Sequence, residues 1–157
     1  MPEHLVGVIS DTHGLMRPEA LRALGGVERI LHAGDVGNRE VLDALQQIAP
    51  LTAVRGNTDR DAWASRLPKT AVVEVGPATL YLLHDLGELD LDPAAAGFAA
   101  VIYGHSHQPH TESRGGVLYL NPGSAGPRRF HLPVTLARLY IRETGLEAEI
   151  LPLLPPA

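Results

Sequence analysis

The sequence predicts a single α/β domain in which two packed β-sheets are flanked by helices. The first 57 residues follow the order strand–helix–strand–helix–strand, which is typical of parallel strands joined by helical crossovers. Residues 69–153 instead contain mostly strand-like runs separated by turn residues, so this half is expected to be largely β. Because no repeat or linker divides the 157 residues, we expect one domain over residues 1–157.

In the first half, apolar, proline and glycine residues mark each element. Pro18 suits the first turn of a helix, and the glycine pair 25–26 suits its C-terminal end. Asn38 is expected to cap a second helix, which Pro50 ends. We therefore expect strands over 5–9, 27–35 and 51–57, and helices over 18–26 and 39–49.

In the second half, turn residues separate runs rich in valine, leucine and tyrosine. Gly76-Pro77 is a turn signal between two such runs, and Glu143–Gly145 is another. We expect a hairpin over 69–85, a short helix over 93–100, strands over 101–104 and 117–124, and a final hairpin over 132–153.

Composition argues against several function classes. The net charge of −5 argues against a general nucleic-acid or membrane-surface binder. The chain shows neither a signal peptide nor an apolar stretch of the roughly 18 residues that span a membrane, so a cytoplasmic protein is expected. Because cysteine is absent, any metal site must use nitrogen and oxygen ligands.

Side chains that bind metals follow five of the predicted strands at the point where each strand ends. In open α/β sheets, sites form at the carboxyl ends of the strands. Residues two positions apart in an extended chain, such as His105 and His107, point the same way and can converge on one ion or flank a pair. The seven candidates are Asp11, His13, Asp35, Asn57, His84, His105 and His107.

Seven candidate ligands are too many for one tetrahedral ion and suit two ions about 3.5–4 Å apart. Asp35 is the natural bridge between the ions, because it is the only carboxylate at the end of the central strand. Each motif alone is commonly a turn or a helix cap. Their joint occurrence at five separate strand ends favours a metal centre.

Two further segments leave alternatives open. His32 is either a residue that supports the ligands from behind or a histidine packed near the sheet edge. Residues 121–129, with Arg128 and Arg129, either contact a substrate phosphate or form a loop with solvated charges.

The ordered motifs "DTHG", "HAGD", "RGNTD", "LLH", "YGHSH" and "NPGS" resemble those of the calcineurin-like metallophosphoesterases, and most closely their small YfcE-type phosphodiesterase branch. The resemblance runs from Asp11 to Ser124. It implies a four-layer α/β/β/α sandwich of two mixed sheets flanked by helices. It also implies a first metal held by Asp11, His13, Asp35 and His107, and a second held by Asp35, Asn57, His84 and His105.

The resemblance further implies a phosphodiesterase in which two ions generate a bridging hydroxide that attacks phosphorus. Asp35 would bridge the ions and the Asn57 amide would stabilise charge on the phosphoryl oxygens. Many family members carry histidine where this chain has Thr58, so the leaving group must take its proton from Asp59, water or another group. We therefore expect activated diesters to react more readily than alkyl monoesters. Asp85 also departs from the glycine usual after the hairpin histidine.

Nitrogen and oxygen ligands suit Mn²⁺, Fe²⁺, Ni²⁺ or Zn²⁺, and the resemblance favours two Mn²⁺ ions. The expected partner is a small phosphodiester substrate, with neither stable nucleic-acid binding nor membrane attachment; a homodimer accords with the family. The alternative function is a non-catalytic scaffold like the retromer subunit of the same fold. In such a protein we would expect replaced ligands, whereas all seven are present here.

Overall fold

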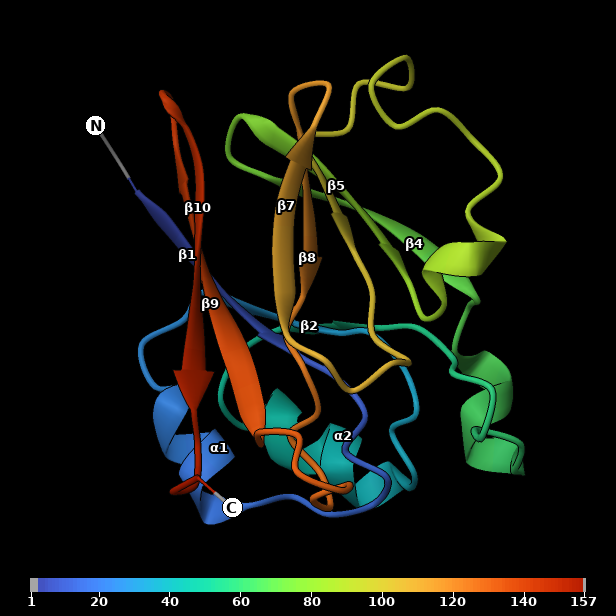
Figure 1. Cartoon of the computed structure of the whole chain (residues 1–157). Helices are drawn as coiled ribbons and strands as arrows, with labels where there is room; N and C mark the ends of the chain where they lie inside the picture. The colour runs from blue at the N-terminus through green and yellow to red at the C-terminus, as the bar shows by residue number, and fades with distance from the viewer. Residues whose placement is uncertain (1–2, 157) are drawn as a thin grey trace.

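The first of two five-stranded sheets is built around three parallel strands from the start of the chain (Figure 1). The structure is a computed structural model and describes residues 3–156. The strand order is β10-β9-β1-β2-β3, with β1–β2–β3 parallel and β9 antiparallel to both β1 and β10. The strands are β1 (His4–Ile9), β2 (Arg29–His32), β3 (Leu51–Ala53), β9 (Thr135–Arg142) and β10 (Gly145–Pro152).

The second sheet has the order β4-β5-β6-β8-β7, and its central strands β5, β6 and β8 are parallel. The outer strands β4 and β7 pair antiparallel with their neighbours. The strands are β4 (Thr70–Val75), β5 (Ala78–Leu83), β6 (Ala100–Ile102), β7 (His110–Arg114) and β8 (Val117–Asn121). Both sheets are therefore mixed, as the predicted fold class requires.

The main core lies between the two sheets. Alternate residues of β1 and β9, such as Val8 and Leu139, pack against residues of β5 and β6, such as Leu80 and Ile102, and all four are fully buried. In a strand, successive side chains face opposite sides of the sheet, so the remaining alternate residues of each sheet need a second cover. Strands β1, β2 and β3 run parallel, as do β5 and β6, so the loops that follow each set lie at one edge of their sheet. Hydrogen bonds between these loops show that the two edges adjoin and form one rim.

Helices cover the outer face of the first sheet. The elements are α1 (Pro18–Ala23), α2 (Arg39–Gln46) and the 3₁₀ helix η1 (Ala62–Arg66). Leu24 and Leu45 pack with Ile30 of the sheet in one buried cluster, and Trp63 packs against it. Asn38 caps α2, because its side chain accepts a hydrogen bond from Val41 N–H at 3.1 Å; the expected cap is confirmed.

An irregular segment covers the outer face of the second sheet. It contains the 3₁₀ helix η2 (Leu86–Glu88) and packs Leu86 and Phe98 against Tyr81 and Tyr103. The expected helix over 93–100 is wrong, because this stretch is a single turn that ends at Gly97 with φ 83°. The three alanines between Pro93 and Gly97 are too few to offset the cost of helix nucleation.

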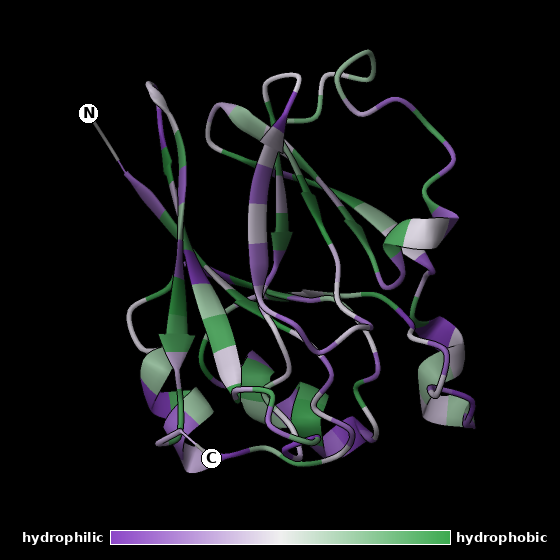
Figure 2. Ribbon diagram, viewed as in Figure 1, coloured by the Kyte–Doolittle hydropathy of each residue, from purple (hydrophilic) through white to green (hydrophobic). Residues whose placement is uncertain are grey.

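The expected hairpins over 69–85 and 132–153 are confirmed by β4–β5 and β9–β10. The edge strand β7 was not predicted: its sequence, HTESR, has no apolar alternation, and Figure 2 draws it mainly in hydrophilic purple. Among the helices of residues 3–156, none has the length and apolar character needed to cross a membrane.

Candidate metal centre

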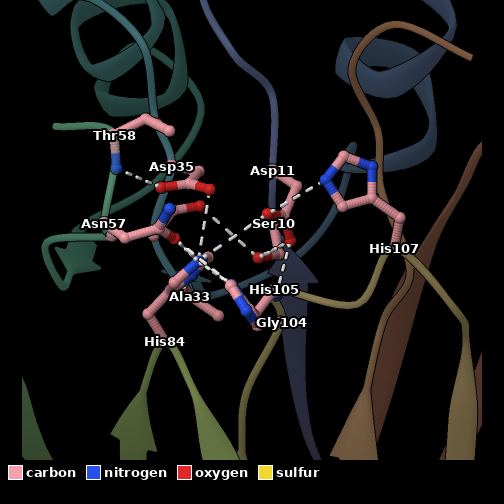
Figure 3. A network of polar contacts seen from close by, with 12 residues as sticks. Ser10, Asp11, Ala33, Asp35, Asn57, Thr58, His84, Gly104, His105 and His107 are labelled. Atoms are coloured by element: carbon pink, nitrogen blue, oxygen red, sulfur yellow. Dashed lines mark hydrogen bonds and ion pairs between the residues drawn. The ribbon is translucent and has the colours of Figure 1, made fainter. Parts of the chain in front are cut away.

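All seven candidate ligands lie in the turns that directly follow strands. Figure 3 shows six of them pointing toward one another: Asp11, Asp35, Asn57, His84, His105 and His107. The first sheet contributes Asp11 and His13 after β1, Asp35 after β2 and Asn57 after β3; the second contributes His84 after β5, and His105 and His107 after β6.

The side chains form two adjoining groups whose potential ligand atoms lie within 4.8 Å of one another. The first group is Asp11, His13 and His107, in which His13 Nε2 lies 3.3 Å from His107 Nε2 and His107 Nε2 lies 3.4 Å from Asp11 Oδ1. The second group is Asp35, His84 and His105, in which His84 Nε2 lies 3.2 Å from Asp35 Oδ2.

Asp35 and Asn57 extend these groups. Asp35 Oδ2 also lies 3.7 Å from His13 Nε2, so this carboxylate faces histidines of both groups. The Asn57 carboxamide oxygen lies 3.0 Å from His84 Nε2 and 3.2 Å from His105 Nδ1. Asn57 therefore adds an oxygen to the second group.

Two buried polar atoms test whether these residues fit metal ions. Within the described chain, Asp11 Oδ1 and His107 Nδ1 are buried without a hydrogen-bond partner. A buried carboxylate oxygen without a donor costs about 1–3 kcal/mol, and such atoms are rare in native proteins. A cation would supply what Asp11 Oδ1 lacks. Carboxylate, imidazole and carboxamide donors also suit divalent first-row transition metals, so the residues present fit such ions.

The backbone that carries the candidate ligands is strained. Five of the seven have φ values between 46° and 74°, in the left-handed region that non-glycine residues seldom adopt. They are Asp11, His13, Asp35, His105 and His107. Residues in this conformation cluster at functional sites, where the surrounding structure holds them in place.

Main-chain hydrogen bonds hold the first two ligand turns together beyond the ends of β1 and β2. Asp11 N–H donates to Gly34 O at 3.0 Å, and His13 N–H donates to Asp35 O at 2.9 Å. Gly104 lets the third turn approach, because a Cβ there would overlap Ser10 Oγ and Asp11 Oδ2. His105 N–H then donates to Asp11 Oδ2 at 3.1 Å.

Two serines that the sequence analysis left without a role also support Asp11. Ser10 Oγ donates to Asp11 Oδ2 at 2.7 Å, and Ser124 Oγ donates to the Asp11 carbonyl at 2.9 Å. Ser124 lies inside the NPGS motif and Ser10 directly precedes DTHG, but nothing else in the sequence marks either residue. Through Ser124, the 121–129 loop therefore supports the backbone of Asp11. Arg128 of the same loop donates a hydrogen bond to the Pro155 carbonyl at 2.7 Å.

Charge and burial shift the titration of the cluster. Burial raises the pKa of Asp35, but hydrogen bonds from His84 and from Thr58 N–H overcome it, so the pKa of Asp35 falls well below its ordinary value. Burial also opposes protonation of His84, yet the contact with Asp35 and the charge of Asp11 raise the pKa of His84. The Ala33 carbonyl, 2.8 Å from His84 Nδ1, fixes that nitrogen as the N–H donor and turns Nε2 toward the cluster.

Asp59 does not suit the proton-donor role that the sequence analysis allowed. Its buried carboxylate accepts hydrogen bonds from the backbone N–H groups of Val36, Gly37 and Gly56 at 2.9–3.1 Å. A proton on either oxygen would oppose these donors, because a protonated carboxyl group is itself a donor. Asp59 instead ties the turn after β3 to the turn after β2.

His32 is packed behind the ligand turns rather than among the ligands. Gly34 N–H donates to His32 Nδ1 at 3.1 Å, which leaves Nε2 protonated and 3.0 Å from Thr12 Oγ1. Thr12 Oγ1 in turn donates to the Val36 carbonyl at 2.7 Å. Full burial lowers the pKa of His32 to about 4, so this bridge between the first two turns uses the neutral ring.

The chain matches the family model described as the calcineurin-like phosphoesterase superfamily domain over residues 5–144. It is 33% identical over 162 aligned residues to a probable metallophosphoesterase of Methanocaldococcus jannaschii, covering 95% of this chain and 81% of that protein. It is 32% identical over 140 residues to the phosphodiesterase YfcE of Escherichia coli, covering 73% and 76%.

Solved structures share the fold, and two of them come from Streptococcus pneumoniae and Chaetomium thermophilum. A conserved Streptococcus pneumoniae protein, described as a predicted phosphoesterase, superposes with a TM-score of 0.78 at 26% identity, covering 98% of this chain and 91% of that one. Vps29 of Chaetomium thermophilum superposes with a TM-score of 0.77 at 20% identity, covering 94% and 97%. At that identity, the likeness to Vps29 concerns the fold alone.

The Asp59→Asn substitution tests the bracing role of this carboxylate. One amide oxygen can still accept hydrogen bonds, but the NH₂ group faces a backbone donor, so we expect the free energy of unfolding to fall by about 2 kcal/mol. Urea denaturation of chelator-treated protein measures the change. Exposed Asp61→Asn is the control and should shift stability by less than about 0.5 kcal/mol. Unchanged stability of Asp59→Asn together with lost hydrolysis would restore the proton-donor role.

His32 predicts a pH dependence of stability. Its folded-state pKa of about 4 lies below the ordinary value of 6.5, so between these values the unfolded chain binds a proton that the folded chain does not. Stability is lost as pH falls through this window, by up to roughly 1.4 kcal/mol per pH unit. In His32→Gln the slope should be shallower by that amount, as measured by urea denaturation of chelator-treated protein at several pH values. The exposed-site variant His110→Gln should keep the wild-type slope; a wild-type slope in His32→Gln would refute the assignment.

Proposed function

The chain belongs to the calcineurin-like phosphoesterase superfamily, and from this membership we propose that it is a metal-dependent phosphodiesterase that works with two divalent ions. The observation that carries the proposal is the meeting of seven nitrogen and oxygen ligands from both sheets in two adjoining groups. The relative named as a phosphodiesterase, 32% identical over most of its length, supports diester hydrolysis over other phosphoesterase reactions.

Each group of ligands would hold one ion. Asp11, His13 and His107 would hold the first, while His84, His105 and Asn57 would hold the second. Asp35 would serve both, because its Oδ2 atom faces His84 and His13. When bound, the ions would polarise the phosphoryl oxygens and lower the pKa of water, so that hydroxide can attack phosphorus near neutral pH.

The protein's own groups would position the substrate and stabilise its charge. The Asn57 oxygen faces two histidines, which leaves the amide NH₂ as a donor toward a phosphoryl oxygen in the transition state. The backbone N–H of Thr58 donates to Asp35 Oδ1 at 3.0 Å and so fixes the shared carboxylate.

Leaving-group chemistry limits the substrate. Asp59 is engaged by three backbone donors, and Thr58 stands where many family members have histidine. The departing oxygen would then take its proton from water, which favours diesters with weakly basic leaving groups. A small phosphodiester is the proposed substrate, and Mn²⁺ is the proposed metal on the strength of the family resemblance.

A non-catalytic scaffold is the second candidate function, because Vps29 shares this fold. The observation against it is the intact ligand set, which includes the buried, unpartnered Asp11 Oδ1 atom. A chain that had given up metal binding would have no reason to keep five ligand residues in a strained conformation.

Metal removal tests the proposed activity. We expect the protein to hydrolyse bis-p-nitrophenyl phosphate, chelator treatment to abolish that hydrolysis, and added Mn²⁺ to restore it more fully than Mg²⁺. Release of nitrophenolate measures the rate. No diesterase activity with Mn²⁺, Fe²⁺, Ni²⁺ or Zn²⁺ would favour the scaffold.

Asp35→Asn tests the shared carboxylate. We expect bound metal to fall by at least one ion per chain and kcat/KM to fall by about a hundredfold or more, because one residue serves both ions. Elemental analysis and the same assay give the two values. Asp43→Asn, at an exposed position of α2, is the matched control and should change neither. Two ions per chain with full turnover in Asp35→Asn would contradict the assignment.

A further inference from the structure

A cavity of about 490 Å³ opens beside the second group of candidate ligands. Asn57 and His84 form part of its wall, so a molecule held at the metal centre can extend directly into it. Three cationic side chains, Arg55, Arg60 and Lys69, line the same cavity. The proposed mechanism gives none of these three a role.

Two hydrogen bonds to backbone carbonyls help to place the cationic residues around the cavity. Arg55 N–H donates to the Pro68 carbonyl at 2.8 Å, which sets the turn after β3 beside the segment that leads through Lys69 into β4. Arg60 Nε donates to the Asn57 carbonyl at 3.3 Å, so its guanidinium folds back toward the ligand turn. Arg55 and Arg60 therefore flank Asn57 in the turn after β3, whereas Lys69 comes from the segment that leads into β4.

These cations lack carboxylate partners. In residues 3–156, the ion pairs that arginine makes with carboxylates involve Arg39, Arg114 and Arg142. Arg55, Arg60 and Lys69 take part in none of the ion pairs within these residues. Arg55 is half-buried, whereas Arg60 and Lys69 are exposed.

Three acidic residues also line the cavity, and two of them are already engaged. Asp59 accepts three backbone hydrogen bonds, and Asp85 Oδ1 accepts one from Gly87 N–H at 2.9 Å, which caps η2. Glu88 is exposed and makes no side-chain hydrogen bond within the described chain. The charged side chains of the lining that can donate hydrogen bonds to a ligand are therefore Arg55, Arg60 and Lys69.

We propose that this cavity is a subsite for a second phosphate group, so that the preferred substrate is a phosphodiester with a phosphate monoester on one of its arms. The inference rests on the proposed function and names its substrate class. A guanidinium presents a fork of donors that matches phosphate oxygens, and an ammonium adds a compact charge. Since two of the cations are exposed, the preference weakens as salt concentration rises.

Two chromogenic esters that differ in a single group test the inference. One is the p-nitrophenyl ester of thymidine 5′-phosphate with a free 3′-hydroxyl, and the other carries a 3′-phosphate. With Mn²⁺-loaded protein we expect KM for the 3′-phosphorylated ester to be about tenfold lower, since charge-assisted hydrogen bonds are worth roughly this factor. Equal KM values, with both esters hydrolysed, would overturn the subsite and leave the phosphodiesterase proposal standing.

Variants assign the preference to the cavity. In Arg55→Gln/Lys69→Gln the ratio of the two KM values should fall to about one. Arg39→Gln/Arg66→Gln, which removes two exposed arginines beside a separate groove between α2 and η1, should keep the wild-type ratio. A wild-type ratio in Arg55→Gln/Lys69→Gln would refute the subsite. If circular dichroism shows that this double variant is unfolded, the exposed single change Lys69→Gln serves instead and should lower the ratio.

Calorimetry separates the subsite from the catalytic activity. If neither ester is hydrolysed, the proposed function fails, but binding can still be measured with Mn²⁺-loaded protein. We then expect thymidine 3′,5′-bisphosphate to bind about tenfold more tightly than thymidine 5′-monophosphate, and the difference to vanish in Arg55→Gln/Lys69→Gln. Equal affinities in the wild-type protein would overturn the subsite on their own.

Discussion

The structure depends on one geometric constraint: side chains from two separate sheets must bring their nitrogen and oxygen atoms within about 5 Å of one another. Because the strands end on a common rim, the turns that follow them lie close together. Turns with ordinary backbone conformations would not direct every ligand side chain toward one point. Five of the seven candidate ligands meet the constraint with a left-handed backbone. Each such residue costs roughly 1 kcal/mol or more, so the surrounding contacts must hold it in place.

Buried hydrogen bonds from non-ligand residues hold these turns. Asp59 joins the second and third turns, and His32 with Thr12 joins the first and second. Ser10 and Ser124 fix both ends of Asp11, the most deeply buried ligand. Glycine is needed where turns from different sheets touch, as at Gly104. The polar residues of this rim therefore form two sets. The candidate ligands face the metal centre, and the residues of the second set hold the ligand turns in position through hydrogen bonds.

The sequence predicted the elements whose patterns are local. The helix expected over 39–49, the Asn38 cap and the Gly76-Pro77 turn each carry their own signal. The structure contains all three, with the helix ending at Gln46. Edge strand β7 is polar and exposed, so nothing in its sequence distinguishes it from a loop; only pairing with β8 defines it. Residues 93–100 have good helix formers but too little length for a helix to form.

The same distinction applies to the site. Ligand types at strand ends are visible in sequence, because the residue type and its place after an apolar run are both local features. The part played by Asp59 depends on three backbone N–H groups, two of them more than 20 positions away, and no spacing rule finds it. The cationic cavity likewise depends on the hydrogen bond between Arg55 and Pro68, which no local pattern reveals.

The division of ligands between the sheets has a mechanical consequence. His13 and His107 belong to different sheets and lie 94 positions apart in the chain. This protein has no cysteine, so it has no disulfide bond. Ions bound between these histidines would cross-link the two sheets, as a disulfide does in other proteins. Unlike a disulfide, this cross-link is lost when the chain unfolds and the ions dissociate. The stabilisation of the folded state that it provides therefore increases with the free ion concentration. The durability of the fold would then follow the metal supply of its surroundings.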